Sequence, residues 1–285
     1  MKLGYNTNGL CHHRLTDAIH LLADEGYRSV AITLDAGALD PYENVRVLNR
    51  QVAATREALD ARGLFRVVET GARYLLNPRR KHDPTLMDPN PAQRGLRVDF
   101  LCRAIDLAER LDAPIVSFWS GILREDIDDE QAFDRLTAGI RKVLDKAESK
   151  NVRLGFEPEP GMFIDTFERF AKLDERLRHP LFDLTIDIGH VHCIEDGPID
   201  AHLLAWGPRI ANIHIEDMLR GVHEHLMFGE GTIDFPPVLR ALRSIGYEGG
   251  LHVELSRDSH KAVEAVRHSA KFLNEADRAD EVRLV

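Results

Sequence analysis

The 285-residue chain has few cysteines and no long apolar run. Its three cysteines, Cys11, Cys102 and Cys193, are widely spaced and form no Cys-x-x-Cys pair, so we expect neither a disulfide framework nor a thiolate zinc site. No stretch approaches the roughly 20 apolar residues that a membrane-spanning helix needs. The N-terminal segment MKLGYNTNGLCHHR lacks the apolar core of a signal peptide. These absences predict a cytoplasmic protein with reduced thiols and no membrane partner.

The chain also lacks an excess of basic residues. It has 37 Lys and Arg against 47 Asp and Glu, a formal net charge of −10. Proteins that bind nucleic acid usually carry a basic surface, so no nucleic-acid partner is expected. Apolar residues make up 44% of the chain, which is ample for a large core. We expect a small-molecule partner, and the composition leaves a homo-oligomer open.

Short β-branched or apolar runs alternate with longer amphipathic segments along the whole sequence. This alternation is typical of a parallel sheet with helical crossovers. Eight runs are predicted to be strands: 3–7, 29–34, 65–69, 114–118, 153–157, 184–187, 210–215 and 250–255. Eight βα units predict an α/β fold, a (β/α)8 TIM barrel, as a single domain over residues 1–274. Residues 275–285 are predicted to be a charged C-terminal tail.

Two local signals refine this prediction. In the segment LTDAIHLLADEG, Thr16 is expected to cap the first helix and Gly26 to take the left-handed conformation after it. The longest irregular segment, residues 70–89, is long enough for a lid or substrate loop. We expect Arg73 on this segment to line a pocket, together with four further residues at the strand ends, Thr7, Asn8, Trp119 and Ser120.

Metal-competent side chains end the last four predicted strands: Glu157, Asp187, His214 and Glu254. In a barrel the carboxyl ends of all strands meet at one mouth, where active sites lie. A single carboxylate at such a position is most often a helix cap or a salt-bridge partner, but four together indicate a metal site. Three carboxylates and one imidazole suit Mn²⁺, and also Co²⁺, Mg²⁺ or Zn²⁺.

The segments FEPEPGM, TIDIGH, NIHIED, HLMFGEGTIDF and HVELS follow one another in this order. In this they resemble the xylose isomerase-like TIM-barrel superfamily of sugar-phosphate isomerases and epimerases, which also contains endonuclease IV and inosose dehydratase. The similarity runs to about Asn274. It implies that Glu157, Asp187, His214 and Glu254 hold one divalent metal, usually Mn²⁺ or Co²⁺.

The resemblance implies roles for three further residues. His190 matches a histidine that contacts substrate in ketose epimerases, and the alternative is a core histidine. Arg220 matches a substrate-contacting arginine, and the alternative is a loop arginine paired with Asp217. Glu230, in the GEG motif, is expected to organise the loop or to orient His190 or His225.

The sequence departs from the resembled patterns in two places. Ketose epimerases carry a second glutamate where this chain has Phe163, and Glu159 is the only nearby acid. His223 and His225 match an Asp-x-His pair that completes a zinc cluster in endonuclease IV. They are expected to bind a second ion, to touch substrate, or to form part of a solvated loop.

The nuclease also has metal-binding histidines at the ends of strands two and three. Here those strands end near Asp35 and at Glu69, so a trinuclear zinc site is not expected.

These patterns lead to one functional hypothesis and several alternatives. Glu157 and Glu254 are predicted to be catalytic, one removing a proton next to a carbonyl and the other returning it. His190, Arg220, His225 and Trp119 are predicted to bind substrate. This describes a divalent-metal-dependent sugar or polyol isomerase/epimerase. The runner-up is an inosose-dehydratase-like lyase; an endonuclease IV-like phosphodiesterase and a non-catalytic barrel also remain open.

Overall fold

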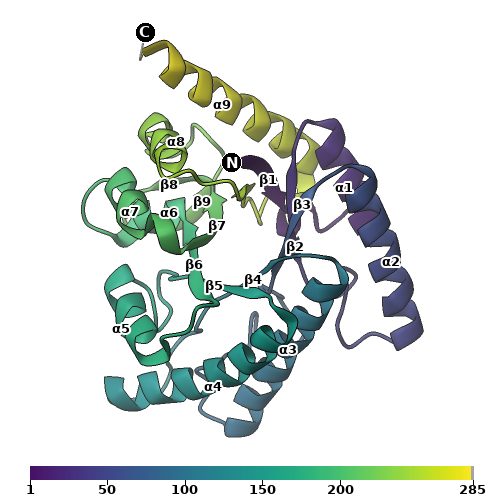
Figure 1. The fold of residues 1–285 in the computed structure, drawn as a ribbon, viewed down its shortest axis with the longest axis vertical. Coiled ribbons are helices and arrows are strands. Elements are labelled where there is room, and N and C mark those ends of the chain that lie inside the picture. Colours follow the sequence, from purple (N-terminus) through teal and green to yellow (C-terminus); the bar gives the residue numbers. More distant parts are fainter. Residues whose placement is uncertain (284–285) are drawn as a thin grey trace.

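Eight short parallel strands close into a barrel, and helices cover its outside (Figure 1). The computed structural model describes residues 1–283. The barrel strands are β1 (Lys2–Asn6), β2 (Ser29–Thr33), β3 (Phe65–Glu69), β4 (Ile115–Phe118), β5 (Arg153–Phe156), β6 (Phe182–Asp187), β7 (Ile210–Ile215) and β10 (Gly250–Val253). Their order around the barrel is β1-β10-β7-β6-β5-β4-β3-β2. The predicted (β/α)8 architecture is confirmed, and all eight predicted strands are present.

The helices that separate the strands pack their apolar faces on the barrel. They are α1 (Leu15–Asp24), α2 (Val45–Ala61), α3 (Pro91–Arg110), α4 (Asp129–Lys150), α5 (Phe167–Leu177), α6 (Ile188–Ile194), α7 (Ile199–Trp206), α8 (Phe235–Ser244) and α9 (Ala262–Arg283). Side chains cap several of them: Asp128 accepts a hydrogen bond from Gln131 N, and Thr166 accepts one from Arg169 N. Such caps satisfy N–H groups that the first turn leaves unpaired.

The first helix begins differently from our expectation. Thr16 lies inside α1, and the N-cap position is Arg14, whose side chain makes no capping hydrogen bond. The predicted cap was wrong because the helix begins one residue before Thr16. Gly26 does adopt a positive φ of 91°, as predicted for the residue after the helix.

The C-terminal helix passes through the predicted domain boundary. Helix α9 continues beyond Asn274 to Arg283, so the predicted charged tail is, as far as residue 283, the end of a helix. Residues 284–285 of that tail lie outside the described residues. Within residues 1–283, no helix has the length and apolarity to cross a membrane, and all three cysteines are free thiols.

A buried polar chain runs through the barrel interior and ends beneath the mouth. Ser29 Oγ lies 2.7 Å from His252 Nε2, and His252 Nδ1 lies 2.8 Å from Asn212 Oδ1. Asn212 then donates to Glu69 at 3.0 Å. Gly4 leaves room for the His252 ring, because a Cβ at this position would overlap it. This chain links the barrel core to the side chains at the carboxyl ends of the strands.

A two-stranded hairpin, absent from our prediction, follows β7. It consists of β8 (Asp217–Leu219) and β9 (Val222–Leu226), which pair antiparallel. The hairpin lies over the carboxyl end of the barrel, next to α6 (Figure 1). It places the histidine-rich segment of the sequence above the mouth.

Candidate active site

The four predicted metal ligands converge at the mouth of the barrel. One ligand atom from each of Glu157, Asp187, His214 and Glu254 lies within 4.8 Å of all the others. His214 Nδ1 is 3.1 Å from Glu157 Oε1 and 2.9 Å from Glu254 Oε2. The expected convergence of the strand ends is therefore confirmed. Glu157 and Glu254 each stand one residue past the end of their strand.

Asp187 serves the fold and the site together. It ends β6 and is the N-cap of α6, where its Oδ1 accepts a hydrogen bond of 2.8 Å from His190 N. This bond fixes the carboxylate in place. Among the described residues, no hydrogen bond reaches the buried Oδ2. Asp187 thus turns one oxygen to the backbone and leaves the other without a hydrogen bond.

Glu69 contacts the edge of the His214 ring that faces away from Glu157 and Glu254. His214 Nε2 lies 3.0 Å from Glu69 Oε1, while Nδ1 faces the two catalytic candidates. A carboxylate behind a metal-binding histidine orients the ring and raises its basicity. We had placed Glu69 at a strand end but had predicted no role for it, because its partner lies 145 residues away.

The electrostatics of the centre favour a positive charge. Burial alone would lower the pKa of His214, yet the carboxylates of Glu69, Glu254 and Glu157 raise it well above its usual value. Burial raises the pKa of Glu157 to about 8, against the lowering effect of His214. Burial would also raise the pKa of Glu254, but the charge of His214 and a hydrogen bond from it hold that pKa below its usual range. The two glutamates therefore have distinct environments although they flank the same nitrogen.

The donor set fits a divalent cation. Buried carboxylate oxygens need a hydrogen-bond donor or a cation. Within residues 1–283, no hydrogen bond reaches Asp187 Oδ2 or either oxygen of the fully buried Glu216. The nearest partners that can carry a positive charge are histidine rings at longer range: His190 Nε2 lies 3.8 Å from Asp187 Oδ2, and His225 Nδ1 lies 3.7 Å from Glu216 Oε2. Carboxylate oxygens with one imidazole are the ligands of hard and borderline divalent ions.

Glu216 is a further fully buried acid beside the centre. It lies directly behind Asp187, and burial together with the charge of Asp187 raises the pKa of Glu216 well above its usual value. Gly189 makes space for it, since a Cβ at residue 189 would overlap the Glu216 carboxyl group. The acidic character of the centre therefore extends beyond the four predicted ligands.

A cavity of about 230 Å³ opens above the four-residue centre. Its lining comes from the strand ends, the segment after β3 and the hairpin: Asn8, Gly71, Arg73, Lys81, His82, Trp119, Glu157, Glu159, His190, His223, His225, Glu254, Ser256 and Arg257. Predominantly polar walls with a few aromatic rings suit a polyhydroxylated small molecule. The predicted contacts Trp119, His190 and His225 are all part of this lining.

Arg220, the fourth residue predicted to bind substrate, lies elsewhere. Within the described residues it is not part of the cavity lining; it lies at the hairpin turn, donates to His192 O at 3.0 Å and approaches Asp196 at 3.5 Å. Its guanidinium thus points away from the centre in this conformation. The alternative pairing with Asp217 is wrong, because Arg220 pairs with Asp196.

The hairpin loop is organised by Asp217 and not by Glu230. The Asp217 carboxylate accepts hydrogen bonds from the backbone N–H groups of Met218, Gly229 and Ile233. Gly231 permits this close packing, because a Cβ there would overlap the carboxylate. Glu230 is exposed to solvent. The expectation that Glu230 organises the loop was wrong, because the acid that is buried against the loop backbone is Asp217.

The segment after β3 forms one wall of the cavity, as predicted for residues 70–89. The His82 ring packs edge-on against Trp119, with ring centroids 5.5 Å apart. Behind Trp119 the guanidinium of Arg97 lies 4.5 Å from the indole centroid, and Arg97 is only 1% exposed. Arg97 carries no sequence signal of this role, since it sits in the middle of α3.

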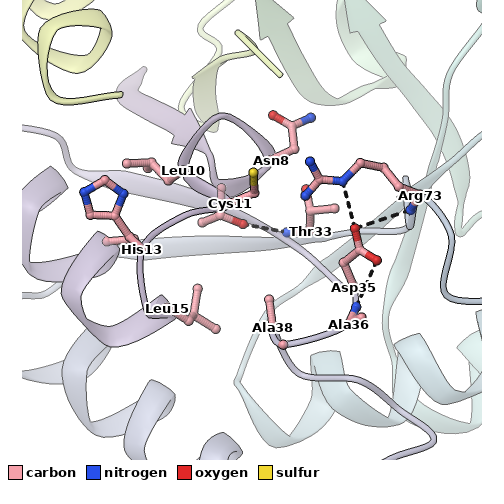
Figure 2. A pocket seen from close by; sticks show the side chains of 13 residues that line it. Asn8, Leu10, Cys11, His13, Leu15, Thr33, Asp35, Ala36, Ala38 and Arg73 are labelled. Atoms are coloured by element: carbon pink, nitrogen blue, oxygen red, sulfur yellow. Dashed lines mark hydrogen bonds and ion pairs between the residues drawn. The ribbon is translucent and has the colours of Figure 1, made fainter. Parts of the chain in front are cut away.

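The structure has a second, smaller cavity of about 80 Å³, whose lining side chains are drawn in Figure 2. The two share Asn8 and Arg73 in their linings. Arg73 Nε forms an ion pair of 2.9 Å with Asp35, which lies just past β2. Thr7, a predicted pocket residue, lines this smaller cavity. Ser120 is buried and accepts a hydrogen bond from Ile164 N, so it supports the wall without lining either cavity.

Comparison with known proteins agrees with this architecture. The chain is 27% identical over 228 residues to the uncharacterized protein MJ1311 of Methanocaldococcus jannaschii. The aligned region covers 71% of this chain and 76% of that protein. It is 26% identical over 196 residues to L-ribulose-5-phosphate 3-epimerase UlaE of Salmonella typhi, covering 66% of each. This chain thus spans just under two thirds of that epimerase.

Solved structures show the same fold at lower identity. The D-allulose 3-epimerase from Methylomonas sp. superposes with a TM-score of 0.77 at 18% identity, covering 97% of this chain and 98% of that one. A crystal structure of IOLI protein with a binding zinc atom gives the same TM-score, identity and coverage. The family model described as xylose isomerase-like TIM barrel matches residues 19–276. The chain therefore belongs to the xylose isomerase-like TIM-barrel family.

Proposed function

We propose that this protein is a divalent-metal-dependent sugar or polyol isomerase/epimerase that moves a proton at the carbon next to a carbonyl group. The observation that carries the proposal is the placement of Glu157 and Glu254. Their carboxylates reach the same nitrogen of His214 from β5 and β10, which are separated in the barrel by β6 and β7. A substrate carbon between them would present one face to each carboxylate.

Glu157, Asp187, His214 and Glu254 would hold the metal, with Mn²⁺ expected and Co²⁺, Mg²⁺ or Zn²⁺ as alternatives. A bound divalent ion supplies Lewis-acid polarisation of the substrate carbonyl, which lowers the pKa of the neighbouring C–H group. Three carboxylates in the set favour the harder ions. The name of the relative L-ribulose-5-phosphate 3-epimerase UlaE supports a sugar substrate.

The protein's own groups would perform the proton transfer. One glutamate removes the proton from the substrate carbon and the other returns a proton to the opposite face, which inverts that carbon. Asn8 Nδ2 donates to Glu254 Oε1 at 2.7 Å and so fixes this carboxylate while its Oε2 faces the centre. Trp119, His190 and His225 would bind the substrate against the cavity wall.

Glu254→Gln tests the proposed role of Glu254. The amide keeps an oxygen donor and nearly the same shape, but it cannot accept a proton at neutral pH. We expect turnover to fall by at least on the order of 10²-fold, the usual scale of general acid–base catalysis, with a smaller effect on KM. The measurement is a screen of keto sugars and polyols with added Mn²⁺, which follows product formation and solvent deuterium uptake at the carbon next to the carbonyl.

Glu264→Gln on the exposed face of α9 is the matched control and should behave as wild type. Wild-type turnover in Glu254→Gln would refute the two-glutamate mechanism. Product formation by loss of a hydroxyl group, in place of inversion, would identify the protein as a lyase.

A further inference from the structure

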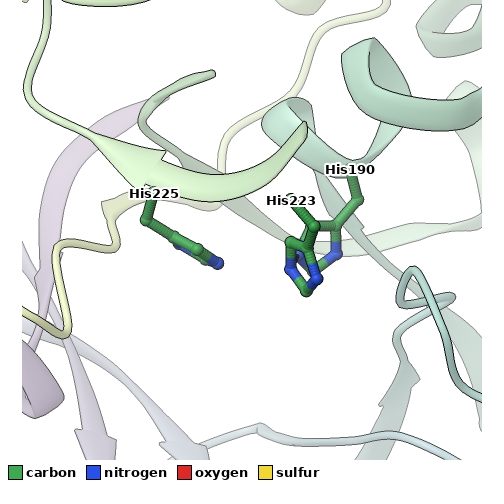
Figure 3. A group of neighbouring side chains, drawn as sticks. All are labelled: His190, His223 and His225. Atoms are coloured by element: carbon green, nitrogen blue, oxygen red, sulfur yellow. Dashed lines mark hydrogen bonds between the residues drawn. The ribbon is translucent and has the colours of Figure 1, made fainter. Parts of the chain in front are cut away.

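Two groups of ring side chains line the main cavity. One group, with ring centroids 4.7 to 5.7 Å apart, belongs to α6 and β9 and consists of His190, His223 and His225 (Figure 3). The other is the pair of His82 and Trp119, whose rings meet edge-on. This second group is distinguished by a buried cation behind it, the guanidinium of Arg97 in α3.

Arg97 has few partners for a buried charge. Its Nη2 donates to Thr70 O at 3.1 Å, but within residues 1–283 its buried Nε and Nη1 make no hydrogen bond. Burial lowers the pKa of Arg97 to about 10, so the guanidinium stays charged at neutral pH. The charge of Asp83 acts against this lowering, yet Asp83 forms its ion pairs with Arg80 and Arg124.

A buried guanidinium without a carboxylate partner is unfavourable for folding. The loss of its hydration is not offset by an ion pair, and an apolar side chain of similar length would fill the same space without that cost. Residues that act against stability in this way are expected where function requires them. The role of Arg97 therefore lies in the groups that its guanidinium contacts.

The guanidinium contacts two parts of the cavity wall at once. Its Cζ lies 4.5 Å from the indole centroid of Trp119, within the range of a cation–π contact. Its hydrogen bond holds the backbone of Thr70, next to the lining residue Gly71. Thr70 Oγ1 in turn donates to Ser117 O at 2.8 Å, two residues before Trp119. The carboxyl ends of β3 and β4 are thus tied together at Arg97.

We propose that Arg97 is a positioning residue for substrate binding, which fixes the indole of Trp119 against the backbone at Thr70 and so sets the shape of this wall. The inference rests on the proposed function, in which Trp119 binds substrate. A planar guanidinium can stack on an indole and donate a hydrogen bond in its own plane at the same time, which an apolar side chain cannot do. An indole that is already ordered spares the free energy of ordering it when a substrate binds.

Arg97→Met tests the proposal, because methionine is apolar, unbranched and adaptable to the same space. The melting temperature of the variant should equal or exceed that of wild type, since an unpaired buried charge is removed. With the sugar that wild type converts, KM should rise by about 2- to 10-fold, the cost of ordering one side chain on binding, while kcat stays unchanged. A purely structural role predicts the reverse: a lower melting temperature and an unchanged KM.

The fluorescence of Trp119 gives a second measurement that needs no substrate. The chain has two tryptophans, so Trp206→Phe leaves Trp119 as the only one. In this background, time-resolved anisotropy should show an immobile indole when Arg97 is present. Arg97→Met should add a sub-nanosecond component, because loosely held side chains move on that timescale. The matched control Arg50→Met, an exposed change on α2, should alter neither the anisotropy nor KM.

The two measurements separate this proposal from the proposed function. An immobile indole in Arg97→Met, an unchanged KM, or failure of this variant to fold by circular dichroism would overturn the positioning role. If wild type converted no sugar or polyol, the proposed function would fail, and the anisotropy of Trp119 would still decide whether Arg97 holds the indole.

Discussion

Single side chains in this barrel connect the structural core to the candidate centre. Glu69 illustrates this: Asn212 donates to it from the barrel interior, and His214 contacts it at the mouth. Its carboxylate completes the chain of contacts that begins at Ser29 and His252. The orientation of His214 therefore depends on a residue that would not touch the metal or the substrate.

Glu69→Gln should weaken metal binding by about 10- to 100-fold, the usual effect of losing a carboxylate behind a metal-binding histidine. The amide preserves the packing but removes the negative charge that holds the His214 ring. Isothermal titration with Mn²⁺ gives the dissociation constant directly. Glu57→Gln, an exposed change on α2, is the control, and equal dissociation constants in both variants would show that Glu69 has only a structural role.

At the scale of elements, the segment after β3 and the β8–β9 hairpin close the cavity from two sides. Both depend on internal contacts that a local pattern does not reveal. The hairpin loop packs around the carboxylate of Asp217, and the β3 segment packs around His82, whose Nδ1 donates to Ala72 O at 3.0 Å. These buried polar contacts make both segments sensitive to substitution.

His82 should make the stability of the protein depend on pH. Burial, and then the charge of Lys81, lower the pKa of His82 from 6.5 to about 4. The unfolded chain thus binds a proton below pH 6.5 that the folded chain binds only near pH 4. The contribution of His82 to stability is complete above pH 6.5 and is lost as the pH falls towards 4.

Urea unfolding midpoints measured across this pH range test the effect. Wild type should lose stability more steeply than His82→Gln, which keeps a polar side chain but has no titrating group. The exposed residue His20 provides the control, because His20→Gln should retain the wild-type slope. If the urea midpoints of wild type and His82→Gln changed in parallel with pH, His82 would not be the source of the pH dependence.

At the scale of the whole molecule, the centre joins strands from distant parts of the chain. Its four proposed ligands come from β5, β6, β7 and β10, and α6, the hairpin and the β3 segment surround them. An ion bound there would link these elements in the folded state only. Metal binding should therefore contribute to the stability of the whole barrel.

Removal of the metal should lower the melting temperature. An ion at 100 times its dissociation constant stabilises the folded state by about 2.7 kcal/mol. For a chain of this size that corresponds to a shift on the order of 5 °C. Differential scanning calorimetry of the Mn²⁺-loaded protein, with and without EDTA, measures it. The Asp187→Asn/His214→Ala variant should not respond to EDTA; an equal response would place the stabilising ion elsewhere.

The sequence alone determined the barrel and the position of its centre. The alternation of apolar runs and amphipathic segments specifies parallel strands, and parallel strands in a closed barrel place every carboxyl end at one mouth. Glu157, Asp187, His214 and Glu254 were therefore predictable as neighbours, although no local pattern joins them. Strand boundaries were predicted to within two residues, because β-branched runs end where polar residues begin.

Only the tertiary structure decided which side chains, apart from those at the strand ends, surround the centre. Arg97 behind Trp119, Glu69 behind His214 and the hairpin that carries His223 and His225 all depend on contacts through space. Arg220 has a suggestive spacing in the sequence, yet it points to Asp196. The periodicity of apolar residues in the sequence specifies on which face of a helix or strand a residue lies. The direction of a long side chain depends instead on the charges and cavities that neighbouring elements place around it.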